Sequence, residues 1–197
     1  MKDLFPLEAY EAADRAATPR TALVMALLWG LPMTAYLVYA RGNLSVGVTI
    51  AIGAGGALLF GLAWAVWMRT SLLKMVRRLH AGDPALVPSP PVGEYDTRFT
   101  ASLMNGRLAV GGHVYVGKRS LCFVPHTKNL KAHQHPTEFR FDAAPLVSVI
   151  ERKPTPFQRL FRPGPVRLLR LGDDQRHLAV LVPNPDDAAR ALLAHFV

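Results

Sequence analysis

The sequence predicts a membrane α-helical hairpin followed by a small antiparallel β domain that ends in a helix. Three observations lead to this fold class. Two long segments near the N-terminus lack charge, a proline-rich stretch follows them, and short alternating strand patterns then continue almost to the C-terminus. The chain has 197 residues, which suits one membrane unit plus one small domain.

The first observation is the pair of uncharged segments, 21–40 and 42–68, which only Arg41 separates. A bilayer core about 30 Å thick needs roughly 20 apolar residues in a helix, so both segments are long enough to span it. We therefore expect transmembrane helices at about 21–40 and 46–68. A cleavable leader ending at Ala40 is less favoured, because the apolar run exceeds a typical signal sequence and charged residues precede it.

Basic residues predict the orientation of these helices, because cytoplasmic flanks are rich in Lys and Arg. The turn between the helices offers Arg41 alone, whereas the flank after the second helix holds Arg69, Lys74, Arg77 and Arg78. We therefore expect both termini in the cytoplasm, with 1–20 as a tail that is either a short interfacial helix or frayed. The Ala, Arg and Pro content is typical of a bacterium, which makes the inner membrane the expected location.

Small residues recur every four positions in the second span, at Gly53, Ala57, Gly61 and Ala65. Such spacing lets helix backbones approach closely in lipid. Packing of the hairpin's own two helices is favoured over dimerisation. Neither span carries an ionisable residue, so the sequence indicates an anchor and not a transporter.

The second observation is the change of composition over 69–93. We expect 69–80 to continue as a basic helix, and four prolines within 82–93 to form an extended, semi-rigid linker. At roughly 3 Å per residue this linker would reach at most about 40 Å, which would hold the following domain near the membrane.

The third observation is the alternation of apolar and polar residues between 94 and 197, which predicts about seven antiparallel strands and a terminal helix. Turns are expected at Asn105-Gly106, at 117–119 and at 172–174. Asn184 suits a helix N-cap and Pro185 the first helical position. The expected strands lie near 99–103, 113–116, 120–123, 137–141, 146–150, 166–171 and 177–182.

The segment around the second and third of these strands resembles the core motif of GRAM domains. It comprises Gly111-Gly112, Tyr115, the turn at 117–119, Leu121, Phe123 and Pro125-His126. Over 97–197 the resemblance implies a pleckstrin-homology-like fold, in which two antiparallel sheets are capped by a C-terminal helix. It also implies a lipid- or protein-binding module without enzymatic activity. The chain departs from the family where Val116-Gly117 replaces the usual Leu-Thr.

A basic run from 152 to 170 is the candidate binding site, since it contains six cations and no acid. Cations beside exposed aromatic rings suit an anionic membrane surface, where each Lys or Arg contributes about 1 kcal/mol. The alternative is a solvated loop whose rings pack into the domain. The candidate lipid- or partner-binding residues are Arg152, Lys153, Arg159, Arg162, Arg167, Arg170, Phe157 and Phe161.

Other chemistries are less favoured. His113, His126, His133 and His135 lack the spacing of a zinc site, and Cys122, the only cysteine, is expected to be a buried inert thiol. No catalytic motif or cofactor-binding loop is present in the sequence, so we expect neither an enzyme nor a cofactor. The net charge of +9 would suit nucleic acid, but its clustering beside a membrane already accounts for it.

These observations predict a membrane-anchored binding module that contacts anionic lipid headgroups, a protein partner or both. The alternative function is a structural or assembly subunit, which associates with copies of itself or with a membrane complex and has no lipid specificity.

Overall fold

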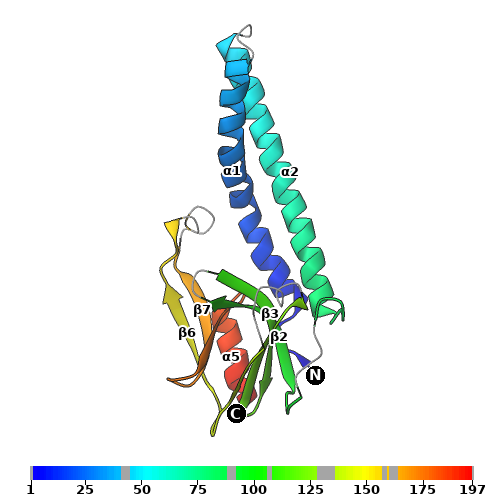
Figure 1. Ribbon diagram of the computed structural model, residues 1–197, viewed down its shortest axis with the longest axis vertical. Helices are drawn as coiled ribbons and strands as arrows, with labels where there is room; N and C mark the ends of the chain where they lie inside the picture. Colours follow the sequence, from blue (N-terminus) through cyan, green and yellow to red (C-terminus); the bar gives the residue numbers. More distant parts are fainter. Residues whose placement is uncertain are drawn as a thin grey trace. The chain divides into compact units, whose positions relative to one another are not determined.

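The computed structural model describes residues 2–40, 45–87, 92–105, 108–127, 136–156, 159 and 164–196. The chain forms two compact units. One unit comprises Glu11–Lys74 and Pro154–Gly164, and contains most of the two long helices. The other comprises Met1–Tyr10, Met75–Lys153 and Pro165–Val197, and contains the β-sheet and the C-terminal helix. Figure 1 shows the elements of both units.

Two long helices dominate the helical unit: α1 (Leu7–Ala40) and α2 (Val46–His80). Each helix includes one expected transmembrane span and continues without interruption into the polar residues beside that span. By length and composition, Thr18–Ala40 and Val46–His80 are the two helical segments of the described chain that could cross a membrane. At 1.5 Å per residue, a helix as long as α2 extends about 50 Å, well beyond an apolar bilayer core of about 30 Å.

The two helices pack through small residues, as the spacing in the second span predicts. A Cβ atom added to Gly30 would lie 1.9 Å from the Cβ atom of Ala57, and one added to Gly61 would lie 2.5 Å from the carbonyl oxygen of Ala22. Ala65 is also buried. Residues earlier in α1 lie beside residues later in α2, as Ala22 does beside Gly61 and Gly30 beside Ala57. The two helices are therefore antiparallel (Figure 1). Packing within the hairpin is thus confirmed.

Within the described ranges the sheet contains seven antiparallel strands, as expected, and it curls (Figure 1). Their order is β5-β4-β3-β2-β8-β7-β6, and β2 joins β8 through only two residue pairs, so the sheet bends between these strands. The strands are β2 (Thr97–Asn105), β3 (Leu108–Gly117), β4 (Ser120–Pro125), β5 (Thr137–Arg140), β6 (Leu146–Arg152), β7 (Val166–Gly172) and β8 (His177–Leu181). Gly106, part of an expected turn, lies outside the described residues.

Helix α5 (Pro185–Phe196) follows the last strand and packs against β6 and β7. Its predicted start is confirmed. The side-chain oxygen of Asn184 accepts a bond from the Asp187 amide at 3.4 Å, and Asp186 and Asp187 lie in the positively polarised first turn. Its buried face contributes Ala188 and Leu192 to the core of the sheet.

This apolar core lies on one face of the curled sheet and takes alternate residues from each strand. Strand β2 contributes Phe99 and Ala101, and β3 contributes Val114 and Val116. Phe123 on β4 is fully buried in the same cluster. The period of two in the sequence therefore identifies the core face correctly.

The N-terminal residues differ from the expected tail, because they extend the sheet. Strand β1 (Lys2–Asp3) pairs in parallel with Thr97 and Arg98 of β2. The Leu4 amide then donates to the carbonyl oxygen of Arg98 at 2.8 Å. Phe5 meets Phe99 edge-on, with ring centroids 5.2 Å apart, and thereby closes one side of the core.

The first part of the expected linker also differs from a free spacer. After α2, the chain turns at Gly82, whose φ of +71° favours glycine. Leu86 and Val87 are then buried with Leu79. The Thr127 amide donates to the carbonyl oxygen of Leu86 at 3.0 Å, which joins this segment to the end of β4. Residues 88–91 lie outside the described part of the chain.

Candidate functional site

The predicted binding residues are distributed over β6, β7 and the segment between these strands. Phe157, Phe161 and Arg162 lie outside the described residues, so the structure places only the other five. Arg152 ends β6, Lys153 follows it, Arg159 lies between the strands, and Arg167 and Arg170 belong to β7.

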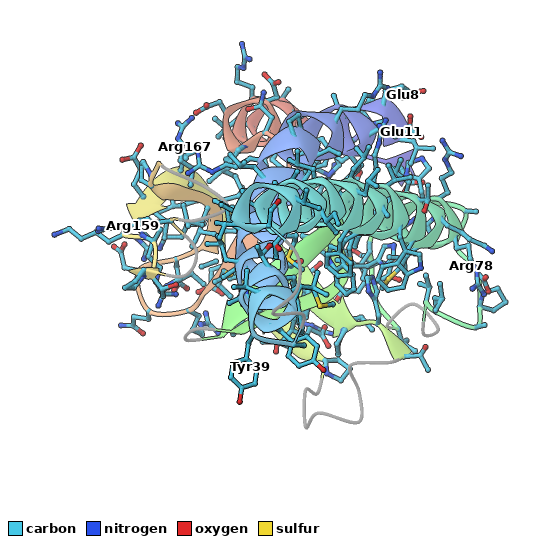
Figure 2. The ribbon with its side chains drawn as sticks, turned by 90° about the horizontal axis from the view of Figure 1, so that it is seen from above. Glu8, Glu11, Tyr39, Arg78, Arg159 and Arg167 are labelled. Atoms are coloured by element: carbon cyan, nitrogen blue, oxygen red, sulfur yellow. The ribbon has the colours of Figure 1, made fainter. Side chains whose placement is uncertain are left out.

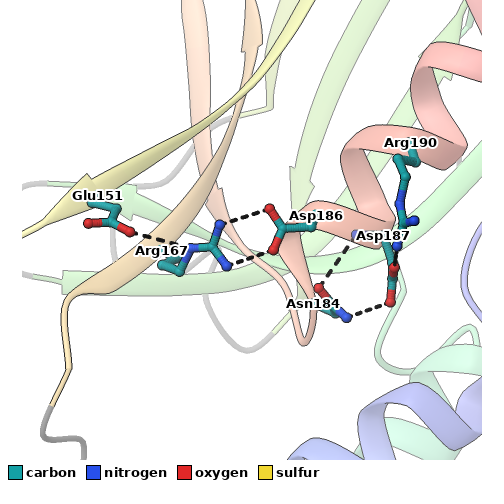
Figure 3. Close-up of polar contacts among 6 residues, drawn as sticks. All are labelled: Glu151, Arg167, Asn184, Asp186, Asp187 and Arg190. Atoms are coloured by element: carbon teal, nitrogen blue, oxygen red, sulfur yellow. Dashed lines mark hydrogen bonds and ion pairs between the residues drawn. The ribbon is translucent and has the colours of Figure 1, made fainter.

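Arg167 is paired with acids inside the domain. Its guanidinium forms a bidentate pair with Asp186 at 2.6 and 2.8 Å and lies 3.6 Å from Glu151 (Figure 3). The hydrogen bonds to Asp186 raise the pKa of Arg167, and the same bonds lower the pKa of Asp186. This geometry links β7 to the first turn of α5, so the Arg167 charge is largely balanced without a ligand.

Arg170 is also held within the domain. Its Nη2 atom donates to the carbonyl oxygen of Asp173 at 3.3 Å and lies 3.8 Å from the Asp174 carboxylate. Both partners belong to the β7–β8 turn, which lies outside the acid-free run. The sequence therefore identifies the cations, but the acids that partner Arg167 and Arg170 come from Glu151 and from residues beyond 170.

Arg159 has a different environment, because Pro154–Gly164 groups with the two long helices. The Nη2 atom of Arg20 on α1 donates to the carbonyl oxygen of Arg159 at 3.1 Å. The side chain of Arg159 is exposed and extends away from the ribbon (Figure 2). Arg20 immediately precedes the uncharged 21–40 segment, so this contact fixes Arg159 at the polar end of that segment.

A polar layer lies on the face of the sheet opposite the apolar core; its members His113, Tyr115 and His126 are buried, whereas Arg98 and Thr100 are partly buried. The neighbouring segments bond to it. The Tyr10 hydroxyl donates to the carbonyl oxygen of Thr100 at 2.8 Å, and the Arg98 guanidinium donates to the carbonyl oxygen of His80 at 3.3 Å. Strand alternation predicts polar residues here, but not their burial.

The two histidines of this layer contact each other, with ring centroids 5.4 Å apart and exposures of 1% and 2%. Nδ1 of His113 and both ring nitrogens of His126 make no hydrogen bond. The pKa of each ring is lowered to about 4, mainly by burial, and the charges of His126 and Arg98 contribute to the shift at His113. The backbone of Leu79 opposes the shift at His113, and the backbone of Gly112 opposes it at His126.

These histidines do not make a metal centre with other described residues. Within the described ranges, no group of three His, Cys, Asp or Glu side chains could hold a metal ion. His133 and His135, which the sequence places nearby, lie outside these ranges. Cys122 is buried, as predicted, and its burial raises the pKa of the thiol to about 11, which disfavours the reactive thiolate.

An open groove of about 1060 Å³ lies beside the β3–β4 turn. Its ionisable lining is balanced, because the acids Glu94, Asp96 and Glu138 face the bases Lys118, Arg119 and Arg140. Glu138 also pairs with Arg140 at 3.3 Å. This balance gives the groove no strong preference for an anionic ligand.

Comparison with known proteins adds no family. No protein-family model matches the chain, and no curated protein matches it.

Proposed function

We propose that the protein is a membrane-anchored binding module whose β6–β7 connection contacts anionic lipid headgroups. Helices α1 and α2 form the anchor in a bacterial inner membrane, with both termini in the cytoplasm. The domain is pleckstrin-homology-like and of the GRAM type, without enzymatic activity. Its seven curled antiparallel strands and C-terminal helix support this proposal, as does the resemblance around Tyr115 and Phe123.

One observation carries the proposal: the hydrogen bond from Arg20 to the carbonyl oxygen of Arg159. Arg20 is the last charged residue before the uncharged stretch of α1, so in a membrane it lies where the helix leaves the headgroup region. A backbone bonded to Arg20 lies at the same depth. The exposed guanidinium of Arg159 is therefore within reach of lipid phosphates.

The lipid class follows from charge. Arg159 belongs to the segment Pro154–Gly164, which contains no acid, whereas the Arg167 and Arg170 charges are engaged inside the domain. Cations near a bilayer attract anionic headgroups, and the attraction weakens with salt. The proposed binding surface is thus smaller than the predicted run and is centred on Arg159.

The depth of this connection can be measured, because Cys122 is the only cysteine and is buried. A nitroxide attached to an Arg159→Cys variant of the full chain in nanodiscs should be shielded from a water-soluble nickel relaxant. The same label on Arg190→Cys, an exposed position on α5, should remain accessible. Equal accessibility at both positions would remove the basis of the proposal.

Lipid preference needs a second measurement. In detergent, the full chain should retain phosphatidylglycerol in preference to phosphatidylcholine, as counted by native mass spectrometry. Arg159→Glu should reduce the anionic lipid retained, whereas Arg190→Glu, which makes the same charge change on α5, should not. Equal retention of both lipids, together with oligomers that form in either, would favour the assembly subunit instead.

A further inference from the structure

Three elements meet at Arg98. Its Nε atom donates to Oδ1 of Asp3 at 2.8 Å and its Nη2 atom to Oδ2 of the same carboxylate at 3.4 Å. The same Nη2 atom donates to the carbonyl oxygen of His80 at 3.3 Å. One side chain of β2 thus binds both β1 and the last residue of α2.

The two bound segments attach to the sheet at further points. Ahead of α1, the Leu4 amide bonds to the backbone of Arg98. Beyond α2, the carbonyl oxygen of Leu86 accepts bonds from the amide and the hydroxyl of Thr127, at 3.0 and 3.1 Å. Asp3 and His80 also approach each other directly, with Nε2 of His80 3.9 Å from Oδ2 of Asp3, and Arg98 forms hydrogen bonds to both of these residues.

We propose that Arg98 couples these attachments, so that β1 and the end of α2 are held on the sheet together and released together. The carboxylate of Asp3 fixes the plane of the guanidinium, and that plane directs Nη2 at the carbonyl oxygen of His80. An orphan carbonyl at a helix C-terminus is a favourable acceptor for a cation. Loss of Asp3 therefore weakens the bond to His80 as well as the bond to β1.

The location of this junction gives it a role. The segment that enters α1 and the segment that leaves α2 are the two ends of the helical hairpin. A ligand or force that displaces one end would loosen the other through Arg98, since coupling between two attachments is reciprocal. The junction is a conformational device that links the two helix ends through the sheet.

Amide hydrogen exchange of the full chain in nanodiscs tests the coupling with three reporters. The Leu4 amide reports β1, the Thr127 amide reports the segment after α2, and the Phe141 amide, bonded to Arg119 at 2.8 Å, reports the rest of the domain. Asp3→Ala should speed exchange at both Leu4 and Thr127 by about tenfold or more, with Phe141 unchanged. Asp187→Ala, which removes an exposed acid on α5, should change none of the three.

Acceleration at Leu4 alone, or at neither reporter, would overturn the proposal. If Asp3→Ala also speeds Phe141, a Thr127→Val variant decides. This change removes the hydroxyl bond to Leu86 and keeps the volume of the side chain. Faster exchange at Leu4 in that variant would support the coupling from the opposite direction, and unchanged exchange at Leu4 would exclude it.

Discussion

Strands β2 and β3 carry apolar side chains on one face of the sheet and mainly polar side chains on the other. One face presents Phe99, Val114 and similar side chains to the apolar core. The other presents Arg98 and Thr100 from β2 and His113 and Tyr115 from β3, and Arg98 bonds there to Asp3 and to His80. His113 is as deeply buried as Phe99, at 1% exposure.

The two faces should differ in how much a change in their side chains affects stability. Apolar side chains need only volume and shape, whereas a buried polar group needs a partner or loses its hydration without compensation. Three ring nitrogens of His113 and His126 make no hydrogen bond. The polar face is therefore the one on which a change of protonation matters most.

Acid should have the largest effect, and it should act on the polar face. Burial holds the pKa of His113 and His126 at about 4, below the ordinary value of 6.5. Above pH 6.5 both rings are neutral in the folded and unfolded states, so the free energy of unfolding does not depend on their protonation. Between pH 6.5 and about 4 the unfolded chain binds the extra protons, and stability falls by about 3 kcal/mol per histidine.

Denaturant titrations of the full chain between pH 7.5 and 4 would measure this loss. Arg98 and His126 face His113 with like charge when the rings are protonated, whereas Asp3 opposes them, so the two titrations are coupled. A variant with His113→Phe and His126→Phe should lose most of the pH dependence. A pH dependence that survives in that variant would place its origin elsewhere.

The sequence alone predicts the apolar face well and the polar face poorly. Period-two alternation locates the strands from Thr97 to Leu181, and turn residues such as Gly172 separate them. From alternation alone, polar residues such as His113 are predicted to face solvent. The segments Lys2–Asp3 and 79–86, which attach to the same domain, have no local pattern in the sequence and are placed by tertiary contacts.

The candidate site shows a similar division. The run of cations from Arg152 to Arg170 is visible in the sequence, because charge is a property of each residue. The pairing of Arg167 with Asp186 is not visible, since it depends on how α5 returns to β7. The bond from Arg20 to Arg159 joins residues far apart in the chain, so the sequence alone does not predict it either.

On the apolar face, Phe123→Ala should destabilise the domain by about 3–5 kcal/mol, because the ring is fully buried and its removal leaves a cavity. The loss should be the same at pH 7.5 and pH 5, unlike the effect of the histidines. Thermal unfolding followed by β-sheet circular dichroism would measure it. A loss below about 1 kcal/mol would mean that the core closes around the missing ring.

A smaller effect is expected where the polar face meets α1. Tyr10→Phe removes the hydroxyl that donates to the carbonyl oxygen of Thr100, while the ring and its packing remain. Since burial raises the pKa of Tyr10, the hydroxyl is protonated and able to donate at any pH of interest. The expected loss is about 1 kcal/mol, the typical net contribution of one hydrogen bond. An unchanged melting temperature would show that water replaces the hydroxyl.

The smallest effect should come from a charge pair that lies on neither face. Arg190 pairs with Asp187 on α5, but 77% of the Arg190 side chain is exposed, so water screens the pair (Figure 3). Asp187 also keeps a second partner, the side-chain amide of Asn184, when Arg190 is removed. Arg190→Ala should therefore change the free energy of unfolding by no more than about 0.5 kcal/mol, with little dependence on salt. A loss above 1 kcal/mol would show that exposure does not decide the strength of polar contacts in this domain, and the contrast drawn with His113 and His126 would then need another cause.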